Sequence, residues 1–311
     1  MGRILFRQQS ARLLWLRNIS HYPEGWLLYL FWLLVGHMSP ARASATGRKL
    51  FRRLGPKTHK HQRIKRNLRL AFGNLSDDET EELARGIWGN FGAVLAEYPH
   101  LAKIRATGAS PRIDVVVDSA TRPILEDRRP AIYVSAHLGN WELVAPTLNA
   151  KGIPLSLVYG PQGNPVLDAL LQAQRQSCSD SRFIAKASAL QQLIRDIRAG
   201  RSVGLLPDQR VDTGEAIDFF GLQAPTTTSP AWLAMKLNCP LVPVQVERMG
   251  DARYRMTFHT PLLTGCEPAN QERLIKTTAD LNALFEQWIR QHPEQWLCMK
   301  RRWPESVYPA S

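Results

Sequence analysis

From residue 111 onward, short β-rich runs alternate with helical stretches, and this order limits the possible folds more than any other feature. The strand-like runs are residues 113–117, 131–136, 155–159, 203–206, 241–247 and 254–258. The last two runs are separated by Met249, Gly250 and Asp251, which predicts a hairpin. We therefore expect an α/β fold with a mostly parallel central sheet flanked by helices and an antiparallel hairpin at one side.

Helical spacing fills the gaps between these strands and also precedes them. The expected helices are residues 77–97, 141–150, 165–176, 187–199, 230–237 and 270–291. The first begins after Ser76 with Asp77, Asp78 and Glu79, a typical capped start, and its apolar residues recur at helical spacing. In sheets of this kind chemistry collects at the carboxyl ends of strands, so a site is expected there.

The positive charge of the chain is confined to its N-terminal part. The 311 residues carry a formal charge of +13, yet residues 1–70 hold 15 Lys and Arg against one acid, Glu24. The remaining residues hold 25 bases and 26 acids and are close to neutral. A basic arm of this kind suits an anionic partner, and nucleic acid and an acidic membrane surface are the usual candidates.

An uncharged aromatic run inside this arm favours the membrane. Residues 26–35 contain two Trp, one Tyr and one Phe among aliphatic residues. A bilayer span needs about 20 apolar residues, whereas a shorter run is typical of an interfacial helix. Bases flank the run on both sides, which favours keeping both flanks on the cytoplasmic face. We expect a helical membrane-associating arm, residues 1–70 with an anchor at about 22–38, followed by one α/β domain, residues 71–311.

Two other interpretations of the apolar run stay open. Four arginines precede it and Ala41-Arg42-Ala43 follows it, as in a signal peptide with its cleavage site. The second alternative is a core helix with a solvated basic surface. The bases that continue after the run argue against the signal peptide, so a monotopic anchor is the preferred interpretation.

The end of the strand at residues 131–136 carries the first candidate site. This strand runs into His137-Leu-Gly-Asn-Trp-Glu142 and then into a helix. We expect Glu142 to accept a hydrogen bond from His137, which would leave the other ring nitrogen free to take a proton from a hydroxyl. Gly139 permits the tight turn between them. The structural alternative is a histidine that merely caps the helix.

A second strand end carries further polar residues. The strand at residues 203–206 leads into Asp208, Gln209 and Arg210, which an ordinary polar turn would also explain. Arg175 lies late in its expected helix and could hold an anionic group or be a plain surface charge. The same two interpretations apply to Lys186.

A run of hydroxyl residues around Thr227 precedes the helix at residues 230–237. Hydroxyls and N–H groups at such a position hold a phosphate or an oxyanion, or they simply cap the helix. The candidate substrate-binding residues are Asn140, Arg175, Asp208, Gln209, Arg210 and Thr227.

Several enzyme classes are disfavoured because their motifs are missing from the sequence. It contains no G-x-x-x-x-G-K-[ST], G-x-G-x-x-G or H-E-x-x-H, and its one G-x-S-x-G match, at residues 200–204, lies at the start of an expected strand and so forms no nucleophile elbow. The four cysteines form no C-x-x-C pair, so neither a zinc site nor a disulfide framework is indicated, and a reducing cytosolic setting is the simpler inference. We expect no metal and no cofactor. A His–carboxylate pair without a Ser or Cys nucleophile suggests direct transfer to a substrate hydroxyl.

The segment from His137 to Glu142 resembles a motif of the bacterial lipid A late acyltransferases, the lauroyl and myristoyl transferases of the lysophospholipid acyltransferase superfamily. Further similar segments are Asp208-Gln209, Asp218-Phe-Phe-Gly221, Ala224-Pro-Thr-Thr-Thr228, Pro230-Ala-Trp-Leu-Ala234, His292-Pro-Glu-Gln-Trp296 and Arg301-Arg302-Trp303. The likeness spans nearly the whole chain. The chain departs from the family at Cys298, where an aromatic is common, and at Lys300, where a His is common.

The resemblance implies that His137 is the general base and Glu142 its partner, acting on a hydroxyl of an acyl chain carried by a lipid A precursor. It implies a thioester donor on acyl carrier protein, with acyl-CoA as the other possibility. It also implies acceptor contacts from Asp208 and Arg210. The expected location is the cytoplasmic face of the inner membrane.

Two other functions stay open at this point. The enzyme could acylate a lysophospholipid or another glycolipid instead. Alternatively, the chain could be a non-catalytic basic protein that binds membranes or nucleic acid, with His137 and Glu142 in structural roles; binding to nucleic acid would weaken steeply with salt. The aromatic run argues against nucleic acid, so we expect no such partner.

Overall fold

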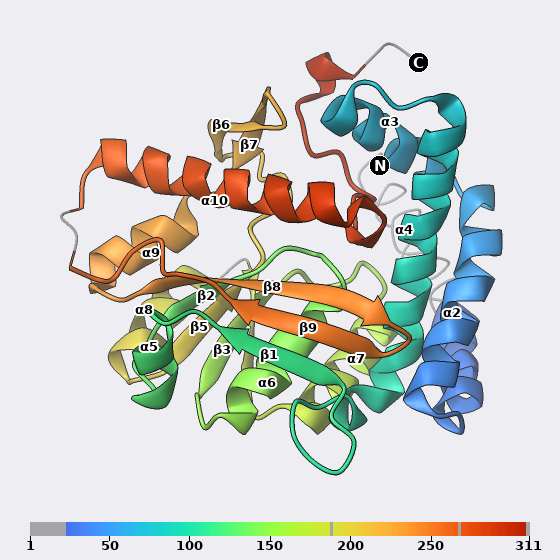
Figure 1. Cartoon of the computed structure of the whole chain (residues 1–311), viewed down its shortest axis with the longest axis horizontal. Coiled ribbons are helices and arrows are strands. Elements are labelled where there is room, and N and C mark those ends of the chain that lie inside the picture. The colour runs from blue at the N-terminus through green and yellow to red at the C-terminus, as the bar shows by residue number, and fades with distance from the viewer. Residues whose placement is uncertain (1–22, 187–188, 267–268, 309–311) are drawn as a thin grey trace, which may run out of the picture.

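The computed structural model describes residues 23–186, 189–266 and 269–308, which include a seven-stranded sheet packed between helices (Figure 1). Its strand order is β1-β9-β8-β2-β5-β3-β4. The strands are β1 (Ile113–Val117), β2 (Ile132–Val134), β3 (Leu155–Tyr159), β4 (Arg182–Ala185), β5 (Ser202–Leu205), β8 (Leu241–Gly250) and β9 (Arg253–Phe258). Strands β8, β2, β5, β3 and β4 run parallel, and β8 and β9 form the expected antiparallel hairpin. The predicted fold class is confirmed.

The helices follow the predicted ranges closely. The α-helices are α2 (Pro40–Leu54), α3 (Lys60–Phe72), α4 (Asp77–Glu97), α5 (Arg122–Glu126), α6 (Val144–Ala150), α7 (Pro165–Cys178), α8 (Ala189–Arg198), α9 (Ser229–Leu237) and α10 (Gln271–Gln291). The 3-10 turns are η1 (Gly55–Lys57), η2 (Tyr98–Lys103), η3 (Trp141–Leu143), η5 (Pro293–Gln295) and η6 (Glu305–Val307). Residues 23–36 are also helical.

The central strands separate two apolar cores because alternate side chains of a strand point to opposite faces. On β2, Ile132 and Val134 pack into one core with Phe285 of α10, while Tyr133 packs into the other with Leu148 of α6. Burial on both faces explains why β2 reads as a continuous apolar run with no polar alternation.

Helix α4 lies beside α2 along one end of the sheet (Figure 1). Its start is a capping box: the Ser76 hydroxyl accepts from the Glu79 N–H, and the Glu79 carboxylate accepts from the Ser76 N–H. Small residues let the two helices approach closely, since a Cβ added at Gly47 would overlap the carbonyl oxygen of Gly92. Helix α4, which carries residues of the active site described below, is thereby held against α2.

The helix at residues 23–36 buries one face against the protein and exposes the other to solvent. Trp32 and Val35 are buried, and the Trp32 indole N–H donates to the Leu95 carbonyl at 2.8 Å. The exposed apolar side chains are Trp26, Leu27, Tyr29, Leu30, Leu33 and Leu34, with Leu50 and Leu54 of α2. Among the described residues no helix is long and apolar enough to cross a bilayer. The basic residues before residue 23 lie outside the described part of the chain.

Some elements differ from the prediction. Strand β4 and the separate hairpin of β6 (Glu215–Phe219) and β7 (Leu222–Thr226) were not predicted. Strand β4 has an exposed arginine and only four residues, too few for a clear alternating pattern. The predicted helix at 187–199 is described from Ala189, since residues 187–188 lie outside the described part. The boundary at residue 70 stays a prediction.

Candidate active site

The sheet register brings His137 and Asp208 together. In the parallel pair of β2 and β5, Val134 lies opposite Leu205. His137 and Asp208 each follow three residues later, so both emerge at the same carboxyl edge of the sheet. The Nδ1 atom of His137 lies 2.6 Å from Oδ1 of Asp208, and the His137 backbone N–H donates to Oδ2 at 3.1 Å.

The Asp208 carboxylate is buried but stays ionised. Burial alone would raise its pKa, but the charge of His137 and the two hydrogen bonds from that residue outweigh burial and lower the pKa. An ionised Asp208 accepts from Nδ1–H, which assigns the imidazole the tautomer with an unprotonated Nε2. The His137 side chain is 17% exposed, compared with 1% for Asp208, so the imidazole is the member of the pair that a substrate can reach.

One polar side chain lies beside Nε2 of His137, and a second contacts that side chain in turn. The Gln209 amide Nε2 lies 3.4 Å from the imidazole Nε2, and the Lys300 ammonium donates to Gln209 Oε1 at 3.3 Å. The Trp141 ring covers the imidazole with centroids 5.1 Å apart. Gln209 therefore lies beside the base, and its predicted contact with substrate stays a prediction.

The predicted hydrogen bond between His137 and Glu142 is wrong. Glu142 Oε1 accepts from the Tyr98 hydroxyl at 2.8 Å, and its two oxygens accept from Arg175 Nε and Nη2 at 2.8 and 2.7 Å. The physical reason is that β5 neighbours β2 and delivers Asp208 to the imidazole, while α7 delivers Arg175 to Glu142. Arg175 outweighs the effect of burial and lowers the pKa of Glu142.

Two other predicted residues are bound to protein groups. Asn140 is fully buried, its Oδ1 accepts from the Glu142 N–H at 3.2 Å, and its Nδ2 donates to Glu97 at 2.8 Å. Arg175 is engaged by Glu142 and has a side chain 16% exposed. For both, this arrangement favours positioning the loop at residues 137–142 over the predicted substrate contact.

Arg210 and Thr227 lie on neighbouring segments and make local contacts. Arg210 donates to the Trp303 carbonyl at 3.0 Å and forms an ion pair with Asp212 at 2.6 Å. The Thr227 hydroxyl accepts from the Ser229 N–H at 3.2 Å just before α9, which matches the capping interpretation. Substrate contacts of Arg210 and Thr227 stay predictions.

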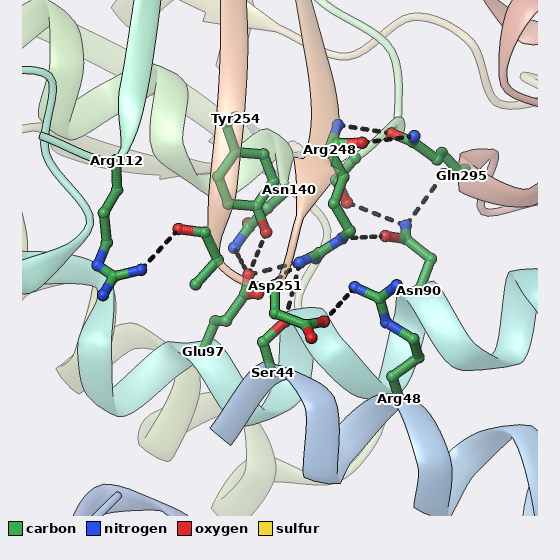
Figure 2. Close-up of polar contacts among 12 residues, drawn as sticks. Ser44, Arg48, Asn90, Glu97, Arg112, Asn140, Arg248, Asp251, Tyr254 and Gln295 are labelled. Atoms are coloured by element: carbon green, nitrogen blue, oxygen red, sulfur yellow. Dashed lines mark hydrogen bonds and ion pairs between the residues drawn. The ribbon is translucent and has the colours of Figure 1, made fainter. Parts of the chain in front are cut away.

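A buried polar network behind the loop was missed by the sequence reasoning (Figure 2). Arg248 of β8 forms a fully buried ion pair with Glu97 of α4, and this pair outweighs burial to lower the pKa of Glu97. Arg248 Nε also donates to Asn90 Oδ1 at 2.7 Å, and Asn90 Nδ2 donates to the Gly139 carbonyl at 3.0 Å. The Tyr254 hydroxyl donates to Glu97 as well.

This network and the start of η2 hold the loop together. Asn90 and Glu97 lie seven residues apart on α4 and hold Gly139 and Asn140, and Tyr98, the first residue of η2, holds Glu142. The available signal was two polar residues seven apart, Asn90 and Glu97, in the otherwise apolar second half of the helix, residues 86–97.

Gly139 allows the loop to lie against β8. Its φ is +56°, in the left-handed region, and a Cβ at this position would overlap the carbonyl oxygen of Val246. The expectation that a glycine is needed at this turn is confirmed. The tight turn keeps His137 close to the end of its strand.

One cavity lies at the other end of the sheet. It measures about 390 Å³ and is lined by residues that flank the amino ends of β2 and β8, including Arg129, Pro130 and Pro240. His137 does not line it, so it is separate from the pair described above. Within the described ranges no group of His, Cys, Asp and Glu is arranged to hold a metal ion.

Comparisons with known proteins identify relatives at low sequence identity. The chain is 25% identical over 305 residues to the lipid A biosynthesis lauroyltransferase of Escherichia coli K12, covering 92% of this chain and 95% of that protein. It is 23% identical over 264 residues to the lipid A biosynthesis myristoyltransferase of the same organism, covering 83% and 80%. Among solved structures, the 1-acyl-sn-glycerophosphate acyltransferase PlsC from Thermotoga maritima matches 78% of this chain and 98% of its own, at 13% identity and a TM-score of 0.37.

The family assignment rests on a match along nearly the whole chain. The model of the bacterial lipid A biosynthesis acyltransferase family matches residues 12–305, which include the helix at 23–36, the loop at 137–142 and Asp208. The chain therefore belongs to the bacterial lipid A biosynthesis acyltransferase family.

Proposed function

We propose that this chain transfers a fatty acyl chain from a thioester donor to a hydroxyl group of a lipid A precursor, with His137 as general base. The observation that carries the proposal is the His137–Asp208 pair at the ends of β2 and β5. A histidine held by a buried carboxylate and reachable at its other nitrogen is suited to deprotonating a hydroxyl. The relatives are lipid A lauroyl and myristoyl transferases, which supports lipid A as the acceptor.

The reaction needs one proton transfer in each direction. The acceptor hydroxyl gives its proton to His137 Nε2 as its oxygen attacks the thioester carbonyl, and Asp208 stabilises the imidazolium that forms. The new C–O ester bond then replaces the C–S bond. The leaving thiolate takes the proton from the imidazolium, so the enzyme returns to its starting state without a covalent intermediate.

Gln209 and Lys300 are assigned to the developing negative charge. The Gln209 amide is a donor next to the imidazole nitrogen, and Lys300 adds a positive charge one hydrogen bond further away. Donors already in place stabilise an oxyanion without rearrangement during the reaction. Glu142 and Arg175 have a different role in this scheme, since they hold the far end of the loop and thereby the position of His137.

The exposed apolar residues of the helix at 23–36 and of α2 form a membrane-docking face in this proposal. Their aromatic and aliphatic side chains suit insertion at the interface, and the bases Lys49, Arg53 and Lys57 suit anionic lipid headgroups. The proposal predicts binding to vesicles with anionic lipids. The variant Trp26→Ser/Leu30→Ser/Leu34→Ser should lose this binding, whereas Val116→Ser, which removes an exposed apolar side chain elsewhere, should keep it.

Mass spectrometry of lipids tests the acceptor. Cells that lack a late lipid A acyltransferase are supplied with the wild-type chain, with His137→Ala, or with His37→Ala as a matched control at an exposed histidine. The proposal predicts one added acyl group on lipid A for wild type and His37→Ala, and none for His137→Ala. Unchanged lipid A with the wild-type protein present in the membrane would contradict it.

The donor is proposed to be an acyl chain on acyl carrier protein. This carrier is acidic, so it suits the basic N-terminal part of the chain. Purified enzyme offered acyl carrier protein and coenzyme A thioesters of the same chain should prefer the carrier protein, and added salt should weaken that preference. An equal rate with both donors would remove the carrier-protein assignment and leave the acyl transfer intact.

A further inference from the structure

A second cavity, of about 110 Å³, lies between α3 and the C-terminal tail. It is lined by His59, Gln62, Arg63, Arg66, Arg301 and Tyr308. Three of these six side chains are guanidinium groups, and none is acidic. A concave site with this lining favours a small anion over any neutral ligand.

The positive charge in this cavity is only partly compensated by the protein. Arg301 forms an ion pair with the exposed Glu305 at 2.5 Å, and its guanidinium lies over the Tyr308 ring. Within the described residues, neither Arg63 nor Arg66 forms an ion pair. Two unpaired guanidinium groups beside a third repel one another, and a multivalent anion between them would remove that repulsion.

The cavity is built on a rigid connection between its two walls. The fully buried Asn67 of α3 donates from Nδ2 to the carbonyls of Cys298 and Lys300, each at 2.7 Å. Its Oδ1 accepts from the Tyr308 hydroxyl, which in turn accepts from the Arg302 N–H at 3.0 Å. The arginines of α3 and Arg301 of the tail therefore keep their spacing whether or not an anion is bound.

The same tail connects the cavity to the active site. Lys300 donates to Gln209, whose amide lies beside His137, and Arg301 is the next residue in the chain. One segment thus reaches from the active site to the cavity. An acceptor that spans this segment would place a hydroxyl at His137 and an anionic group in the cavity.

We propose that this cavity binds a phosphate monoester on the headgroup of the acceptor glycolipid and so selects phosphorylated acceptors. The inference rests on the proposed function, because it assumes a glycolipid acceptor at His137. A phosphate monoester carries close to two negative charges and several acceptor oxygens, which match guanidinium donors arranged as forks. A cavity of this size suits one phosphate group, whereas an acidic carrier protein would use a broader surface.

The test compares the double variant Arg63→Gln/Arg66→Gln with wild type, using a phosphorylated lipid A precursor and the same precursor after enzymatic removal of its phosphate. Wild type should prefer the phosphorylated acceptor. The variant should raise the KM for that acceptor about tenfold or more, because bonds to charged groups are lost, and should remove the preference. The KM for the donor should not change.

Two controls separate the cavity from general effects. Arg122→Gln/Lys151→Gln removes the same charge from exposed positions outside the cavity and should leave both KM values unchanged. Arg63→Lys keeps the positive charge but loses the forked donors of the guanidinium. Its KM for the phosphorylated acceptor should therefore lie between the values for wild type and for Arg63→Gln/Arg66→Gln. Thermal unfolding of each variant shows whether the fold is retained.

A binding measurement keeps this inference distinct from the proposed function. The ³¹P NMR signal of glucosamine 1-phosphate should broaden when wild-type enzyme is added. It should stay sharp when Arg63→Gln/Arg66→Gln is added. If wild type binds this probe but does not acylate the precursor, the proposed function fails and the phosphate site stands. Equal KM values of wild type and the double variant for the phosphorylated acceptor would overturn the inference. If wild type broadened the ³¹P signal while the two KM values were equal, the cavity would bind free phosphate only. A rise in the donor KM would also overturn it and would indicate a carrier-protein surface.

Discussion

Two buried carboxylates flank the same loop, and their basic partners differ in what they can do. His137–Asp208 and Arg248–Glu97 each join a base to a buried carboxylate whose pKa is lowered by its partner. The Arg248 and Glu97 side chains are 5% and 0% exposed, and an arginine does not give up its proton. His137 can exchange a proton and is partly exposed. A buried pair is thus a candidate for chemistry only when one member both titrates and can be reached.

The largest effect is expected from removing the base. His137→Ala should lower kcat by about 10²- to 10⁴-fold, the range typical of general-base catalysis, while the melting temperature changes little. The comparison is made with acyl transfer rates and thermal unfolding on the same preparations. If His137→Ala transferred acyl chains at the wild-type rate, the His137–Asp208 pair would not be the catalytic site.

The second pair should matter first for stability. Glu97→Ala leaves the Arg248 charge buried without a partner and should cost about 3–5 kcal/mol of unfolding free energy. The double variant Glu97→Leu/Arg248→Met removes both charges and should unfold less easily than Glu97→Ala. Denaturant unfolding measures both. If Glu97→Ala unfolded like wild type, the network would not be holding the loop as described.

Acid should weaken the framework through its carboxylates. The pKa values of Glu97, Glu142 and Asp208 are lowered in the folded protein, so these groups bind protons more readily when unfolded. Their contribution is fully present above the unfolded pKa values of about 4 and is lost as the pH falls through the lower folded values. Glu142→Gln lacks one of these carboxylates. Its melting temperature should therefore fall less than that of wild type when the pH is lowered from about 5 to about 3, across the unfolded pKa of about 4. Parallel pH curves of the melting temperature would disagree with the assigned ionisation.

The smallest effect is expected at the exposed rim of the network. Arg48 and Asp251 form an ion pair with side chains 40% and 41% exposed (Figure 2). Asp251→Asn should change the unfolding free energy by about 1 kcal/mol or less and leave kcat unaltered, because exposed pairs contribute little. A loss as large as that of Glu97→Ala would mean that the rim and the buried pair act as one unit.

The sequence contained both members of the catalytic pair but not their pairing. His137 and Asp208 each follow an apolar strand, and both strands were recognisable from their composition. Strand order was not, because β2 and β5 are separated by β3, β4 and three helices along the chain and meet only through the sheet. Glu142 was chosen because it is near in sequence.

The buried network was hidden for a related reason. Arg248 lies near the end of β8, where the apolar run gives way to polar residues, and it resembles a surface charge until α4 is placed against it. Helices with clear apolar spacing were predicted well, and α4 matches its predicted range at both ends. Contacts between distant segments depend on topology, which a local pattern does not contain.

The most direct test of the account is the hydrogen bond on His137 itself. A short Nδ1–H bond to a carboxylate gives a strongly downfield proton resonance, which the His137→Ala variant identifies by its loss. The account predicts that Asp208→Asn removes this resonance and that Glu142→Gln retains it. A resonance that survives Asp208→Asn and disappears in Glu142→Gln would show that Glu142, and not Asp208, holds the catalytic base.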